Sequence, residues 1–174
     1  MRTLVGALLS SALGCSSGLD LLENGSSRGP IEIPPIEMER VIFEGYHGDL
    51  RDLLVTAASA TVDMTEHVAN LRDVAIGFST EDASKVEISA PVGVFHLDGD
   101  DFTLSDGVTG HTAEGERFTT EAVNYISKRQ VLASHSPVEL RRSSLHLTAS
   151  GMELEVHTHK LRLTGNVRAR VQPK

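Results

Sequence analysis

Cys15 is the single cysteine of this 174-residue chain, so the chemistry of one thiol is the first question that the sequence raises. A lone thiol can serve as a catalytic nucleophile, a metal ligand, a buried apolar group or a site of lipid attachment. Here the thiol follows an apolar run at residues 4–13, with Arg2 before the run and Gly14 after it. A basic start, an apolar stretch and a small residue at its end are typical of a secretory signal peptide.

A cysteine directly after that small residue is typical of bacterial lipoproteins, although Ala12 stands where such signals usually have leucine. We therefore predict that residues 1–14 are a lipoprotein signal peptide and that Cys15 is the site of lipid attachment. The apolar run is far shorter than the ~20 residues that a membrane-spanning helix needs. Residues 15–37, with their Gly, Ser and Pro runs, are predicted to be a lipidated N-terminus and flexible linker.

The other residues that could carry chemistry do not form a convincing catalytic or metal site. His157 and His159 are two apart on a predicted strand and would project from one face, but no third ligand is evident and a solvated face explains them. His135 lies in a Ser-rich turn without a nucleophile elbow. Residues 98–101 are acidic but favour a hairpin turn over a calcium loop. We predict no catalytic residues, no metal and no cofactor.

Composition limits the class of partner and the kind of core. The formal net charge is −8, and removal of residues 1–14 takes away only Arg2, which leaves −9. Such a chain lacks the basic excess that neutralises phosphates along nucleic acid, so we predict no nucleic-acid partner. Aromatic residues make up 4% of the chain and Trp is absent, so the core must consist mainly of Val, Leu, Ile and Ala.

Apolar and polar residues alternate with period two along most of the chain after residue 36, which indicates antiparallel sheets with one covered face. We prefer a long strand over a helix at residues 50–65 because of their Val and Thr content. Short, evenly spaced strands separated by turns are typical of a sandwich, a barrel or a jelly roll. The predicted turns are centred on Asp98–Asp100, Asp106–Gly107, Glu114–Gly115, Ser134–Pro137, Ser150–Gly151 and Gly165–Asn166.

A weak internal sequence similarity, which we call the internal echo, accompanies these turns. Residues 89–92 (SAPV) resemble residues 134–138 (SHSPV), and residues 104–108 (LSDGV) resemble residues 163–167 (LTGNV). The echo indicates a repeated hairpin module, although it does not fix a period.

The order of elements in the second half of the chain resembles a known family. Residues 115–125 (GERFTTEAVNY), predicted to be one strand, lead into segments at 131–140 and 147–152 and into a last strand at 161–168. This run resembles the periplasmic lipopolysaccharide-export proteins of the LptC type, and more loosely the LptA-like bridge proteins of the same OstA-like superfamily. The resemblance covers about residues 38–171.

This resemblance implies a single all-β domain at residues 38–172, an open β-jelly roll of antiparallel strands whose apolar interior receives the acyl chains of lipid A. It implies that the protein takes lipopolysaccharide from an inner-membrane ABC transporter and passes it to a soluble LptA-like bridge protein by edge-strand pairing. It also implies a periplasmic, lipid-anchored protein without enzymatic activity. The anchor would lie in the inner membrane by preference, or in the outer membrane.

We expect residues 39–44 to form the edge toward the transporter and residues 161–171 the edge toward the bridge. Arg162, Arg168 and Arg170 on the latter would meet phosphates or acidic partners, or would simply discourage aggregation. The residues predicted to line the lipid groove are Val86, Ile88, Phe102, Leu104, Phe118, Val138, Leu140, Leu145, Leu147, Leu154, Val156, Leu161 and Leu163. Periodicity does not distinguish a lined groove from a filled core, so a structural lipoprotein that binds only protein is the alternative function.

Overall fold

The computed structural model describes residues 34–171 apart from 48, 80–84, 113–114 and 159, and these lie within one compact unit. Cys15, the predicted signal peptide and His159 therefore lie outside the described residues. The described part of the chain is almost entirely β-structure with one turn of 3₁₀ helix, η1 (Ser127–Arg129), so the prediction of an all-β antiparallel fold is confirmed. Within these residues, no helix has the length and apolar character needed to cross a membrane.

The strands form one antiparallel sheet of 14 strands, in which the first four are long and the rest short. The second strand has 14 residues, as the preference for a strand over a helix in this segment predicted. The strands are β1 (Ile36–His47), β2 (Leu50–Asp63), β3 (Val68–Ser79), β4 (Lys85–His96), β5 (Asp101–Ser105), β6 (Val108–Thr112), β7 (Arg117–Thr120), β8 (Val123–Ile126), β9 (Val131–Ser134), β10 (Val138–Arg142), β11 (Leu145–Ala149), β12 (Gly151–Glu155), β13 (Lys160–Thr164) and β14 (Arg168–Val171).

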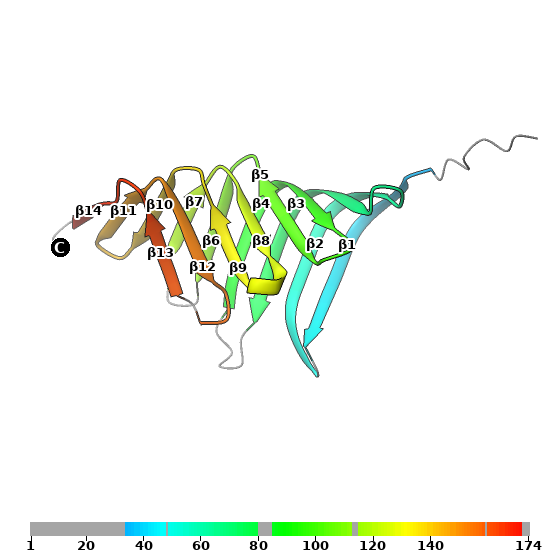
Figure 1. Ribbon diagram of the computed structural model, residues 1–174, viewed down its shortest axis with the longest axis horizontal. Coiled ribbons are helices and arrows are strands. Elements are labelled where there is room, and N and C mark those ends of the chain that lie inside the picture. Colours follow the sequence, from blue (N-terminus) through cyan, green and yellow to red (C-terminus); the bar gives the residue numbers. More distant parts are fainter. Residues whose placement is uncertain (1–33, 48, 80–84, 113–114, 159, 172–174) are drawn as a thin grey trace, which may run out of the picture. The chain divides into compact units, whose positions relative to one another are not determined.

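The sheet folds into two layers because β4 changes partner halfway along its length. Residues 86–89 of β4 pair with β6, whereas residues 92–96 pair with β5. From this fork, β5, β8, β9, β12 and β13 continue as layer A, and β6, β7, β10, β11 and β14 continue as layer B. In Figure 1 layer A lies in front and the fainter strands of layer B lie behind it. The long strands β1 to β4 belong to both layers.

The two layers join along one line, which we call the corner line. In β4 the buried residues are Val86, Ile88 and Ala90 before Pro91 but Gly93 and Phe95 after it, so the strand changes its inward face there. Proline lacks the N–H that ladder pairing needs, which explains the missing pair between Pro91 and Asp73 of β3. The same interruption continues through β2 and β1. In register with Pro91 across the long strands, the corner line passes through Asp73, Ala58 and Arg40.

After β4, the chain crosses the corner line at intervals of about 15 residues, each time passing from one layer to the other. The crossings lie between β5 and β6, β7 and β8, β9 and β10, β11 and β12, and β13 and β14. This explains the internal echo: residues 104–108 and 163–167 both cross from layer A to layer B, and 89–92 and 134–138 both pass the corner. Hairpin turns within each layer lie on the opposite side, which we call the open side. Among the described strands, no pairing joins the two layers there.

Three sequence expectations are corrected by the structure, the first two by these crossings and the third by a hairpin turn. Residues 115–125 are not one strand but parts of β7 and β8, in different layers. Residues 161–171 are likewise two strands, β13 and β14, because Gly165 (φ 66°) and Asn166 (φ 48°) adopt the left-handed backbone of a sharp turn. His157 follows β12 in a turn rather than lying on a strand.

Candidate functional site

The predicted groove residues all face the space between the two layers, but most of them are tightly packed. Leu145, Leu147, Leu161 and Leu163 are half-buried. The other nine are at most 5% exposed and belong to one apolar cluster: Val86, Ile88, Phe102, Leu104, Phe118, Val138, Leu140, Leu154 and Val156. The middle of the interior is therefore a filled core, whereas the two ends are accessible.

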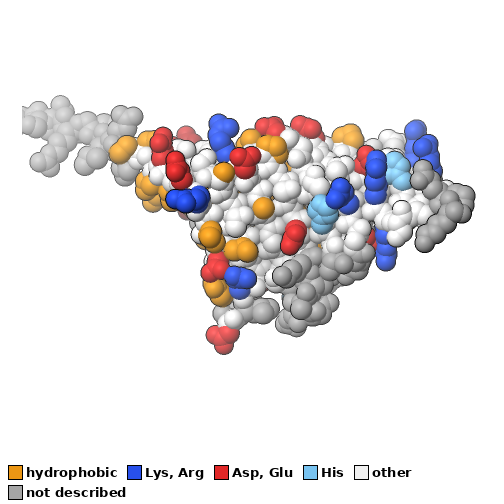
Figure 2. Space-filling model, turned by 180° about the vertical axis from the view of Figure 1, so that it is seen from behind, with side chains coloured by type: hydrophobic (Ala, Val, Ile, Leu, Met, Phe, Trp, Pro, Cys, Tyr) orange, Lys and Arg blue, Asp and Glu red, His pale blue; other side chains and the backbone are white. Residues whose placement is uncertain are grey.

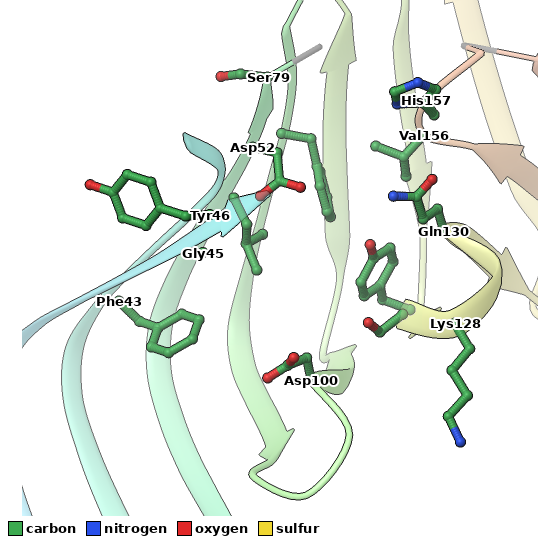
Figure 3. A pocket seen from close by; sticks show the side chains of 14 residues that line it. Phe43, Gly45, Tyr46, Asp52, Ser79, Asp100, Lys128, Gln130, Val156 and His157 are labelled. Atoms are coloured by element: carbon green, nitrogen blue, oxygen red, sulfur yellow. The ribbon is translucent and has the colours of Figure 1, made fainter. Parts of the chain in front are cut away.

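A cavity of about 390 Å³ opens between the layers toward the N-terminal end. Figure 3 shows Phe43 and Tyr46 of β1 on one side of it and Gln130 and Val156 on the other. Its volume lies within the range of natural ligand pockets, about 300–1,000 Å³. The polar residues at its rim include Asp52, Asp100, Lys128 and His157, and its apolar residues include Leu53, Phe78 and Tyr125.

Aromatic rings form the inner wall of this cavity. The Tyr125 ring centroid lies 4.9 Å from that of Phe102 and 5.2 Å from that of Phe78. Nearby, Phe43 of the first strand packs on Phe95 at 5.3 Å and is still 41% exposed. Offset and tilted ring pairs contribute about 0.5–1.5 kcal/mol each beyond the area they bury. Apart from Phe118, the few aromatic residues of the chain are therefore concentrated at one end of the interior.

The mouth of the cavity is acidic on one side. Burial raises the pKa of the Tyr125 phenol, and the nearby carboxylates of Asp52 and Asp100 raise it further. The phenol thus stays protonated, with a hydroxyl group available at the edge of an apolar surface. On the outer side of β1 and β2, a 2.6 Å ion pair with Arg51 lowers the pKa of the Glu44 carboxyl.

The C-terminal end of the interior is the second accessible region. Leu145 and Leu147 come from β11 in layer B, and Leu161 and Leu163 come from β13 in layer A. Beyond them every residue of β14 is exposed. Half-buried leucines on two facing layers leave an apolar surface that another hydrophobic group can cover.

Unpaired strand edges border both accessible ends. Within the described residues, β1 pairs only with β2, so residues 39–44 lie on a sheet edge, as the sequence predicted. At the other end β13 pairs only with β12, and β14 only with β11, so each layer ends in its own edge strand. Such edges carry free backbone donors and acceptors that a further strand can pair with.

Sequence reasoning missed Phe43, Leu53, Phe78, Tyr125 and Lys128 as cavity residues. The scarcity of aromatic residues could have singled out Phe43, Phe78 and Tyr125. Their proximity could not be predicted, because they lie on β1, β3 and β8, which come together only in the folded domain. The described residues contain no group of three His, Cys, Asp or Glu side chains that could hold a metal ion. His157 is exposed at the cavity rim.

Comparisons with known proteins agree with this architecture. A family model described as "Lipopolysaccharide-assembly, LptC-related" matches residues 38–172. Among solved structures, the fold is similar to the crystal structure of LptH, described as the LptA homologous periplasmic component of the lipopolysaccharide transport device of Pseudomonas aeruginosa. That match has a TM-score of 0.55 at 11% identity and covers 70% of this chain and 95% of LptH, so the likeness is one of fold. No curated protein is matched by the sequence.

Proposed function

Because the chain belongs to the LptC-related family of lipopolysaccharide-assembly proteins, we propose that it is an export adaptor that holds lipopolysaccharide acyl chains between its two layers. As a member of this family it is a component of lipopolysaccharide transport, and its homologues are periplasmic. The adaptor takes lipopolysaccharide from an inner-membrane ABC transporter and passes it to a soluble LptA-like bridge. The observation that carries this proposal is an apolar interior that is accessible at both ends and that, within the described part of the chain, is joined by strand pairing on one side only.

Acyl chains enter by parting the layers along the open side. The layers share backbone hydrogen bonds along the corner line, whereas on the open side no strand pairing joins them among the described residues. Transfer of a methylene from water to an apolar site is favourable by about 0.8 kcal/mol, or about 10 kcal/mol for a chain of a dozen methylenes. A chain that replaces contacts between core side chains therefore keeps most of that free energy, and movement along the interior needs no chemistry within it.

The two edges define the direction of transfer in this proposal. The transporter pairs with β1, beside the N-terminal cavity, and the bridge protein pairs with β13 or β14 beyond Leu161 and Leu163. A lipid on Cys15 holds the domain at the membrane through the linker at residues 15–37, and we favour the inner membrane because the transporter lies there.

Photo-crosslinking in cells tests the proposal. A photoreactive amino acid at Phe43 or Leu163 is expected to trap lipopolysaccharide, since both side chains face the interior. Ile42 and Arg162 are the matched controls, because each directly precedes the inner residue on the same strand and is exposed on the outside. Equal trapping at inner and outer positions, or none at either inner position, would refute the proposal.

A second candidate function is favoured by the packed middle of the interior. Nine of the thirteen predicted groove residues are at most 5% exposed, as in a solid core. A structural lipoprotein that binds only protein through its edges would have such a core. Protein partners recovered from membranes without any lipid in the mass spectrum of the purified chain would favour this alternative.

A further inference from the structure

The outer face of layer B carries a row of basic side chains. The register aligns one residue from each successive strand: His111 is opposite Arg117, Arg117 opposite Arg141, Arg141 opposite His146, and His146 opposite Arg170. With strands about 4.8 Å apart, the row is about 19 Å long. We call it the basic row; its members are His111, Arg117, Arg141, His146 and Arg170.

This row is only partly neutralised by its own surroundings. Glu139 on the same face contacts both Arg141 and His146, with Nε of Arg141 2.7 Å and Nε2 of His146 2.7 Å from its Oε1. A second carboxylate, Glu87, lies opposite His111, and Arg168 adds a further positive charge beside Arg170. In Figure 2, which shows the molecule from behind, several blue and pale-blue side chains lie toward the end of the domain that carries β14.

The pair of Arg117 and Arg141 is unfavourable for the isolated sheet. Like charges directly opposite each other on neighbouring strands destabilise the pairing. Both arginines are exposed, and no carboxylate contacts Arg117 within the described residues. Arginine guanidinium groups bind oxyanions such as phosphate through two N–H groups each. A phosphate between them would remove the repulsion.

The next row of residues makes the same face suitable for a sugar. Thr119, Glu139 and Thr148 lie opposite one another in register, directly beside the basic row. They line a shallow hollow of about 550 Å³. Hydroxyl and carboxylate groups at its edge can donate to or accept from sugar hydroxyls.

The position of the basic row relates it to the interior. His111 and Arg117 flank the turn between β6 and β7, and Arg141 and His146 flank the turn between β10 and β11. Both turns lie on the open side, where a lipid with its acyl chains between the layers would leave its headgroup. The headgroup would then emerge within reach of the outer face of layer B.

We propose that the basic row and the adjoining hollow bind the phosphorylated sugar headgroup of lipopolysaccharide while its acyl chains lie between the layers. This inference rests on the proposed function. It adds a second contact with the lipid, on the outside of the sheet, that binds the phosphate groups rather than the acyl chains. It also gives the C-terminal half of an acidic protein a local surface that attracts an anionic lipid.

The test compares two probes, lipid A and the same lipid A after removal of its phosphates. The row variant combines Arg117→Gln and Arg141→Gln, and a matched control combines Arg40→Gln and Arg72→Gln, two exposed arginines of the N-terminal half. At about 1 kcal/mol per arginine near an anionic surface, the row variant is expected to bind phosphorylated lipid A about 30-fold more weakly. The control variant keeps wild-type affinity, and the dephosphorylated lipid binds wild type and row variant equally.

Melting curves of both variants verify that the domain is folded, since removal of a like-charge pair does not destabilise a sheet. If the row variant binds phosphorylated lipid A with wild-type affinity, the proposal is overturned and the proposed function is left intact. This holds even if the row variant no longer binds an acidic protein partner, because the row would then bind protein rather than lipid. An equal loss of affinity in the control variant also overturns it, because the effect is then one of net charge. Absence of binding of either lipid to wild-type protein refutes the proposed function itself.

Discussion

Gly110 of β6 lies directly beneath the ring of Phe118 on the inner face of layer B, and substitution of this glycine tests how tightly the interior is packed. A Cβ atom at position 110 would lie 2.0 Å from Cε1 and 2.1 Å from Cζ of the ring. Carbon atoms prefer about 3.5–4.0 Å, so the ring would have to move by about 1.5 Å or more. Phe118 is only 2% exposed, so a displaced ring must move against its buried neighbours.

Gly110→Ala is therefore expected to lower the free energy of unfolding by about 3 kcal/mol, the upper end of the usual range for overpacking. For a domain of this size that corresponds to a fall in Tm of roughly 6–12 °C. Phe118→Leu alone should lower the free energy of unfolding by about 1–2 kcal/mol, because it removes part of a buried ring. In the double variant the added methyl group fills space that the ring has left. The loss of unfolding free energy in the double variant should therefore be smaller than the sum of the two single-variant losses by about 1 kcal/mol or more.

Urea unfolding of the four proteins measures these values, with equal m-values as the condition for comparing them. Gly77→Ala is the matched control, since no atom lies within 4 Å of an added Cβ there and the change should be neutral or slightly stabilising. A loss below about 0.5 kcal/mol for Gly110→Ala, or strictly additive losses in the double variant, would refute the packed arrangement of this face.

Three further predictions concern the corner line and the cavity. The buried hydroxyls of Thr120 and Ser134 lie 2.8 Å apart across the corner, so Ser134→Ala should destabilise the domain by about 1–3 kcal/mol in urea, and a neutral result would show that this contact is dispensable. Gly165→Ala should destabilise it by about 1 kcal/mol or more, because φ is +66° and an added Cβ would lie 3.0 Å from Cβ of Ser150; an unchanged Tm would contradict this. Burial raises the folded-state pKa of Tyr125, so the contribution of its phenol to stability is full below the unfolded pKa of about 10 and is lost as the pH rises through the folded pKa. The Tyr125→Phe variant should therefore lose less unfolding free energy between pH 8 and pH 11 than the wild type. Equal losses in the two proteins would disprove this prediction.

The fold class followed from the sequence because period-two alternation of burial is clear in several strands, such as β5, β7 and β13. Val86, Ile88 and Ala90 alternate with exposed residues as predicted, and turns separate the short strands at predicted positions such as Asp106–Gly107 and Gly165–Asn166. What the pattern did not reveal is which turns change layer: Gly165–Asn166 links two layers, whereas Asp98–Asp100 closes a hairpin within one, and both have the same turn chemistry. The division of residues 161–171 into two edge strands was missed for this reason.

The candidate site was predictable in its apolar character but not in its degree of filling. Leu104 and Leu163 have the same alternation, yet one is fully buried in the middle of the interior and the other half-buried at its end. The difference in burial between the two leucines depends on which residues of the facing layer pack against each of them. A local sequence pattern does not contain this information. The basic row likewise consists of residues from five strands that only the register aligns.

The distance between the two rims of the cavity tests the central claim most directly, because acyl chains that lie between the layers must part them on the open side. Spin labels at Asp52 on the layer B rim and at Lys128 on the layer A rim report that distance by pulsed electron spin resonance. Saturation with lipid A is expected to shift the distance distribution to longer values, while a label pair at Glu121 and Ser150 on the corner line keeps its distance. Bound lipid A with an unchanged distance across the rims would contradict the account.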